Sequence, residues 1–261
     1  DKTLDQQTRA SALAHRSHGF SRLCSEGGGR AMRVLSYNIR KAVGLDRRYN
    51  PERVLGVIAE SGADVAILQE ADKRLGARPA AIPKRLIEME SDYDLVDLGG
   101  TDVSLGWHGN AVLVKPGVRV LALRRLPLPG LEPRGAVLVE VERAGLGRVT
   151  LVGAHLGLLR RWRRRQMHSL SDHIDPAARG RTIIAGDFNE WSPENGFEPL
   201  GHAFELVTPG RSYHTAYPVA ALDRFAHGAG LKVTASGVIR DGAARQASDH
   251  LPVWAEFAPT R

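Results

Sequence analysis

Three apolar, β-branched runs follow one another between residues 111 and 154 with no helical pattern between them, and this spacing constrains the fold most. Neighbouring parallel strands need a long crossover, usually a helix, whereas antiparallel strands need only a turn. The pattern therefore argues against a purely parallel, doubly wound sheet. It favours a mixed, largely antiparallel core of two sheets with helices outside.

Two kinds of periodic segment complete the expected architecture. Strands are expected at residues 33–39, 65–68, 111–114, 136–141, 149–154, 182–185 and 252–257. Helices are expected at 51–60, at about 78–89 and at about 158–174.

Size and composition allow a single large domain. The chain has 261 residues, of which 43% are hydrophobic and 25% charged, which is typical of a globular protein. No apolar run approaches the roughly 20 residues of a membrane span. Cys24 is the only cysteine, so an intrachain disulfide and a cysteine-based zinc site are excluded.

The first 30 residues differ from the rest of the chain. They are polar, weakly periodic and end in Gly27, Gly28 and Gly29. We expect residues 1–30 to form a flexible N-terminal tail, followed by one domain over 31–261. The net charge of +7 favours anionic partners such as phosphate esters, nucleic acid or acidic membrane surfaces.

Polar side chains recur where the expected strands end. The segment RTIIAGDFNEWSP is typical: Asp187 and Asn189 follow a buried run and point to the same side, because strand side chains alternate. An Asx turn would explain this pair alone. Similar residues end or precede other strands, which favours one shared site; they are Asn38, Glu70, His155, Asp249 and His250.

This residue set suits metal-assisted hydrolysis. Carboxylate and amide oxygens without a thiol favour Mg²⁺, Mn²⁺ or Ca²⁺. Histidines beside such a cation would transfer protons near neutral pH. The sequence contains neither a G-x-S-x-G nucleophile motif nor a phosphate-binding G-x-x-x-x-G-K-[ST] motif, which argues against a serine hydrolase and a P-loop enzyme.

Eight short motifs across residues 32–258 together resemble the endonuclease/exonuclease/phosphatase superfamily, the DNase I-like metal-dependent phosphoesterases. In chain order they are SYNI, LQE, HGNAVL, EPRGA, AHLGL, GDFN, LDRF and SDHLPV. The resemblance implies a four-layered α/β sandwich of two mainly antiparallel mixed sheets packed face to face, with helices outside. It also implies a Mg²⁺ cofactor, with Mn²⁺ as the alternative.

The resemblance implies a role for each matching residue. Metal ligands would be Asn38, Glu70 and Asp249. Asp187 would orient or deprotonate the attacking water, and Asn189 would position that water or a phosphate oxygen. His250 would contact the scissile phosphate with Asp223 fixing its tautomer, and His155 would be the general acid. Asn110 and Arg134 would contact the substrate, although loop packing explains them equally well.

Two alternatives stay open for charged segments. Asp223 could instead bridge Arg224 on the surface. RRWRRRQ, residues 160 to 166, opens the expected helix and is either a solvated face or an electrostatic rim for a polyanion or anionic lipid headgroups. Trp162 within it could pack on the core, stack on a base or lie at a lipid interface.

The expected function is hydrolysis of a phosphate ester, most readily a phosphodiester, by water attack. Substrates in this class are phospholipids, nucleic acids and small metabolites. A DNA endonuclease or exonuclease is one alternative, and a non-catalytic phosphate-binding relative is another. We expect a cytoplasmic monomer without a stable protein partner, with peripheral membrane association as a variant.

Overall fold

Two six-stranded sheets form the centre of the protein in a computed structural model that describes residues 31–73, 76–99 and 101–260. The strand order is β11-β12-β1-β2-β4-β3 in one sheet and β5-β6-β7-β8-β10-β9 in the other. The strands of the first sheet are β1 (Met32–Asn38), β2 (Val65–Gln69), β3 (Asp94–Leu95), β4 (Ala111–Val114), β11 (Leu231–Val238) and β12 (Val253–Pro259). Those of the second are β5 (Val118–Leu128), β6 (Arg134–Arg143), β7 (Gly147–His155), β8 (Thr182–Asp187), β9 (Glu205–Val207) and β10 (Asp223–His227).

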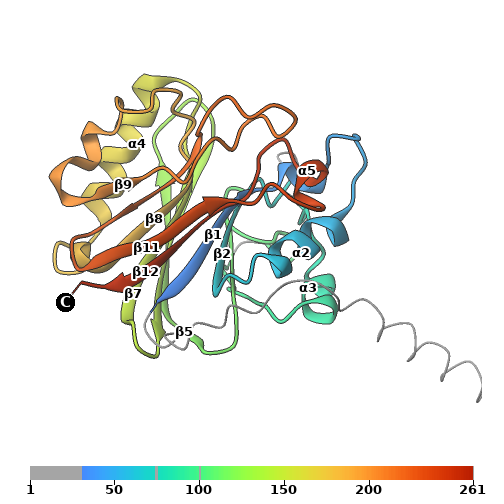
Figure 1. The fold of residues 1–261 in the computed structure, drawn as a ribbon, viewed down its shortest axis with the longest axis horizontal. Coiled ribbons are helices and arrows are strands. Elements are labelled where there is room, and N and C mark those ends of the chain that lie inside the picture. The colour runs from blue at the N-terminus through green and yellow to red at the C-terminus, as the bar shows by residue number, and fades with distance from the viewer. Residues whose placement is uncertain (1–30, 74–75, 100, 261) are drawn as a thin grey trace, which may run out of the picture.

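Helices cover the two outer faces of the sandwich. The α-helices are α2 (Pro51–Glu60), α3 (Lys84–Glu90), α4 (Arg160–His173) and α5 (Ala244–Ala247), and the 3₁₀ turns are η1 (Arg40–Ala42), η2 (Arg179–Arg181) and η3 (Glu198–Ala203). In Figure 1, α4 lies on one side of the sheets, and α2, α3 and α5 lie on the other. The four-layered sandwich implied by the resemblance is confirmed. None of the helices within the described residues is long and apolar enough to cross a membrane.

Strand alternation divides the core into three apolar layers. On β1, Met32 and Val34 face the other sheet, whereas Leu35 and Tyr37 face α2. On β8, Ile183 joins the layer between the sheets, and Ile184 packs towards α4. Both sheets are thus buried on both faces, which explains their nearly continuous apolar runs.

A glycine in the middle of β7 allows the two sheets to approach closely. A Cβ atom on Gly153 would lie 2.7 Å from Cγ2 of Ile67 in the opposite sheet and 3.1 Å from Cγ2 of Val137. Either distance is shorter than an ordinary van der Waals contact. A larger side chain at Gly153 would therefore push the sheets apart.

Most expected elements are confirmed, and one of them needs correction. Residues 136–141 and 149–154 lie inside the longer strands β6 and β7. The helix expected at about 78–89 is wrong in its first part, because α3 begins only at Lys84, after Pro83. Proline donates no backbone hydrogen bond and disfavours a helical residue before it. The expected tail, residues 1–30, lies outside the described residues.

We predict that Gly153→Val lowers the free energy of unfolding by about 1–3 kcal/mol, because it overpacks the layer between the sheets. Chemical denaturation measures this directly. Gly56→Ala is the matched control, since its Cβ would meet nothing within 4 Å on helix α2. The control should be neutral or slightly stabilising. Equal stability of Gly153→Val and the wild type would contradict the close packing described here.

Candidate active site

The polar side chains meet where the two sheets end together. Inward positions along β1 change from apolar Met32 and Val34 to polar Ser36 and Asn38. On β8 the inward position at the end of the strand is Asp187. Nδ2 of Asn38 donates a hydrogen bond of 3.0 Å to Oδ2 of Asp187, which joins the two sheets at this edge. Both side chains are buried.

Asp187 lies at the centre of this group. Its Oδ2 is 3.4 Å from Nε2 of His155, which ends the parallel neighbour strand β7, and 3.8 Å from Nε2 of His250. Its Oδ1 accepts a hydrogen bond of 2.9 Å from the backbone N–H of Asn189. Asp187 thus makes the Asx-type contact of a turn former and also faces two histidines, so the two interpretations of this segment are compatible.

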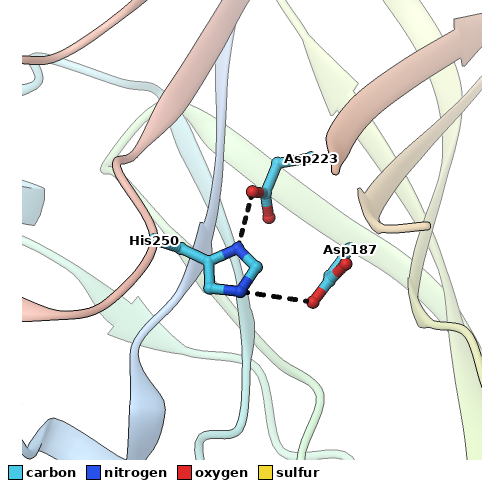
Figure 2. Close-up of side chains that lie close together, drawn as sticks. All are labelled: Asp187, Asp223 and His250. Carbon is cyan, nitrogen blue, oxygen red and sulfur yellow. Dashed lines mark hydrogen bonds and ion pairs between the residues drawn. The ribbon is translucent and has the colours of Figure 1, made fainter. Parts of the chain in front are cut away.

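His250 bridges two carboxylates, as Figure 2 shows. Its Nδ1 lies 2.8 Å from Oδ2 of Asp223, while its Nε2 faces Asp187. Oδ2 of Asp223 also accepts a 2.6 Å hydrogen bond from Oγ of Ser212. The ring of Tyr213 packs against His250 at a centroid distance of 4.9 Å. These contacts fix the orientation of the imidazole ring.

The close carboxylates set the charge of His250. Burial lowers its pKa, but the charges of Asp223 and Asp187 and the hydrogen bond to Asp223 outweigh burial and raise the pKa to about 10. The imidazole is therefore protonated at neutral pH. Its Nδ1–H donates a hydrogen bond to Asp223, and its Nε2–H can point towards Asp187 or towards a phosphate oxygen at that position.

At Asp187, the effect of burial on the pKa outweighs the effect of the nearby positive charge. Burial raises its pKa, the charge of His250 lowers it, and the charge of Asp223 raises it again, which gives a pKa of about 6. A carboxylate with a pKa near the working pH is ionised often enough to accept a proton and basic enough to hold it. The site therefore contains a candidate base between two histidines.

Glu70 lies in a cavity beside this group. The cavity has a volume of about 110 Å³ and is lined by Glu70, His155 and Arg134, among others. The ammonium group of Lys41 forms an ion pair with Glu70, and Arg134 pairs with Glu132 at 2.9 Å. Glu70 thus lies in the same cavity as His155, whereas His250 does not line that cavity.

The expected metal ligands fit a hard cation in their chemistry. Glu70 and Asp249 provide carboxylate oxygens. Glu70 forms an ion pair with Lys41, and Asp249 forms one with Arg40, so both carboxylates already have a positive charge beside them. Oδ1 of Asn38 is an oxygen donor of the kind that Mg²⁺ binds, and it accepts the backbone N–H of Arg40 at 3.1 Å.

A second acidic group also has ligand-like geometry. Ligand atoms of Asp187, Asp223 and His250 all lie within 4.8 Å of one another. However, Nδ1 of His250 is hydrogen-bonded to Asp223, and the protonated ring would repel a cation. The chemistry of this trio suits proton transfer better than metal binding.

Two asparagines have clear structural contacts. Nδ2 of Asn110 donates to the carbonyl oxygen of Gly135 at 2.9 Å and so ties its loop to β6. Nδ2 of Asn189 donates to the carbonyl oxygen of Leu156 at 2.9 Å. Substrate contacts by Asn110 and Asn189 stay predictions.

Two buried arginines that sequence reasoning did not assign hold the loop after β8. Arg163 of the basic run points inward and pairs with Glu190 at 2.8 Å. Arg224 donates to the carbonyl oxygens of Ser192 and Pro193 and lies over the ring of Phe197. The alternative of a surface ion pair between Asp223 and Arg224 is wrong, because alternation places them on opposite faces of β10. The sequence does not indicate that Arg163 points inward, because most of its neighbours in the run are also arginines.

Comparisons with known proteins agree with this architecture. The profile of the Endonuclease/Exonuclease/phosphatase family matches residues 35–250. The chain is 25% identical over 247 residues to the uncharacterized protein YbhP of Escherichia coli K12, covering 87% of this chain and 96% of YbhP.

Solved structures share the fold at lower sequence identity. An endonuclease/exonuclease/phosphatase from Beutenbergia cavernae is 23% identical with a TM-score of 0.68, over 88% of this chain and 72% of that chain. D. rerio TDP2 complexed with single strand DNA product is 18% identical with a TM-score of 0.65, over 87% and 98%. Bacteroides thetaiotaomicron mannosyl-6-phosphatase Bt3783 is 16% identical with a TM-score of 0.67, over 87% and 99%.

We predict that Asp187→Asn gains stability relative to the wild type as the pH rises from about 4 to above 6. The pKa of Asp187 is about 6 in the folded protein and lower in the unfolded chain. The folded wild type therefore loses stability as the pH rises from the unfolded-state pKa to about 6. Asparagine avoids that cost and keeps an oxygen for the N–H of Asn189, but its amide nitrogen replaces the oxygen that accepts from Asn38, so the variant starts from a lower stability at pH 4. Melting temperatures measured across this range test the prediction.

Glu194→Gln is the matched control for this measurement, because Glu194 is an exposed carboxylate in the same loop. Its melting temperature should follow the wild type at every pH. A difference in melting temperature between Asp187→Asn and the wild type that does not change with pH would contradict the buried charge and favour a purely structural turn.

Proposed function

Because this chain belongs to the endonuclease/exonuclease/phosphatase family, we propose that it is a divalent-metal-dependent phosphoesterase that hydrolyses a phosphodiester by attack of water. The family includes phosphatases and nucleases and acts on phosphoester bonds. The observation that carries the proposal is the position of the Asp187 carboxylate, which faces His155 and His250 and is hydrogen-bonded to Asn38 from the other sheet.

The side chains divide the reaction among them. Asp187 orients the attacking water and accepts its proton, and Asn189 positions that water. The protonated His250, oriented by Asp223, neutralises charge that develops on the phosphoryl oxygens. His155, whose Nε2 faces the same carboxylate oxygen of Asp187, protonates the leaving oxygen. Arg134 contacts the substrate from the cavity wall, and Asn110, which follows Gly109 of that wall, is the second proposed substrate contact.

Glu70 and Asn38 would hold Mg²⁺ or Mn²⁺, with Asp249 as a further ligand. The bound ion would supply a Lewis acid for a non-bridging phosphate oxygen. The carboxylate of Glu70 supports this assignment, because it lines the same cavity as His155 and already accepts the positive charge of Lys41.

We predict that chelation by EDTA abolishes hydrolysis of a soluble phosphodiester and that Mg²⁺ or Mn²⁺ restores it. Glu70→Gln removes one charged ligand, so half-maximal activation should need at least about tenfold more Mg²⁺. Glu60→Gln, an exposed change on α2, is the control. Full activity after rigorous chelation would refute the metal dependence, and unchanged Mg²⁺ activation in Glu70→Gln would place the ligand elsewhere.

We also predict that Asn189→Ala lowers kcat by about 10²–10⁴ while the protein remains folded, because the attacking water loses its positioning group. Steady-state kinetics and melting temperature on the same sample measure both properties. Ser192→Ala in the same loop is the control and should retain turnover. A normal kcat with a lower melting temperature would assign Asn189 to the loop alone.

A screen of soluble phosphodiesters, phosphomonoesters, DNA and phospholipids with each metal would identify the substrate class. Binding of a phosphate ester without turnover of any of these would favour the non-catalytic alternative.

A further inference from the structure

Several large apolar side chains are exposed on the surface of the protein. They include Tyr49, Leu131, Leu158, Leu159, Trp191, Tyr217 and Val219. Single exposed apolar residues are normal on a protein surface, but a group around a binding site marks an interaction surface.

One part of this group forms a continuous patch, which we call the leucine patch: Leu131, Leu158, Leu159 and Trp162. Leu131, Leu158 and Leu159 are 73%, 63% and 52% exposed. All four residues line one hollow of about 60 Å³. Glu132 lines both this hollow and the cavity that contains Glu70 and His155, so the leucine patch adjoins the candidate active site.

Basic side chains flank the leucine patch. Helix α4 begins directly after Leu159 with the exposed residues Arg160 and Arg161. Arg163 and Arg164 of the same run form ion pairs with Glu190 and Glu198, so they are committed within the protein. The surface beside the leucine patch is therefore both apolar and cationic.

The details of this patch favour a lipid surface over nucleic acid. The ring of Trp162 already carries the guanidinium groups of Arg161 and Arg165, with 5.5 and 4.9 Å to the ring centroid, and a base would have to displace them to stack. Leucine side chains offer no stacking face. They gain free energy by leaving water for hydrocarbon, while flanking arginines attract anionic headgroups.

We propose that the leucine patch, together with Arg160 and Arg161, docks the protein on an anionic phospholipid membrane and delivers a membrane phospholipid to the candidate active site. The leucines enter the boundary between headgroups and acyl chains, and the arginines contact lipid phosphates. This inference rests on the proposed function, since it names the substrate class of the same site.

Sedimentation of the full chain with vesicles tests the docking. The wild type should bind vesicles of phosphatidylglycerol and phosphatidylcholine and bind pure phosphatidylcholine far more weakly. The double variant Leu158→Glu/Leu159→Glu should lose at least about tenfold in partition, and Arg160→Glu/Arg161→Glu about tenfold as well. Met89→Glu and Arg85→Glu, both exposed on α3 in the opposite helical layer, are the controls and should bind as the wild type does.

Hydrolysis rates measured on vesicles and on a soluble substrate test whether docking assists the reaction. With Mg²⁺ present, the leucine double variant should hydrolyse vesicle phospholipid at least about tenfold more slowly and a soluble phosphodiester at the wild-type rate. Absence of soluble diester hydrolysis by the wild type would refute the proposed function, whereas vesicle binding would be unaffected by that failure.

Three results would overturn the docking proposal. The first is no binding of the wild type to anionic vesicles. The second is wild-type binding by Leu158→Glu/Leu159→Glu, because the leucines would then have no part in it. The third is loss of single-stranded DNA binding in both double variants without any vesicle binding, which would assign this surface to nucleic acid.

Discussion

The hydrogen bond between Asn38 and Asp187 spans the two sheets at the edge where the site lies. It exists because the inward positions of β1 and β8 meet across an apolar layer that continues until the last residues of both strands. Close approach of the sheets, which Gly153 permits, is therefore a condition for the site as well as for the core. The packing that stabilises the fold is the same packing that collects the polar side chains.

Burial at this edge determines the protonation of the site. Asp187 is excluded from water, so its carboxylate holds a proton more strongly than usual, while two carboxylates keep His250 charged. Such groups usually lower stability and are retained where they serve a reaction. The loop that follows Asn189 is stabilised by the buried arginines Arg163 and Arg224, which are not among the reacting groups. Rigidity of the loop and charge of the site are thus supplied by different residues.

Sequence patterns predicted the features that depend on residues close together in the chain. Asp187 and His155 could be identified because each ends an apolar strand whose alternation is visible in the sequence. Strand β5 was not expected, since its exposed arginines hide the alternation of an outer strand. The Arg163–Glu190 pair joins residues 27 positions apart, and only the packing of α4 determines which arginine points inward. The leucine patch likewise needs the loop between β5 and β6 to meet the loop before α4 and the first turn of that helix.

The central claim is that Asp187 and His250 act as one unit on a single water and phosphate. Turnover of a soluble phosphodiester by Asp187→Asn, His250→Gln and the double variant tests it directly. When two residues act as a unit, the effects of substituting them do not add. The double variant should therefore lose no more activity than the less active of the two single variants. Losses that multiply in the double variant would show that the two side chains act independently, and would contradict the account.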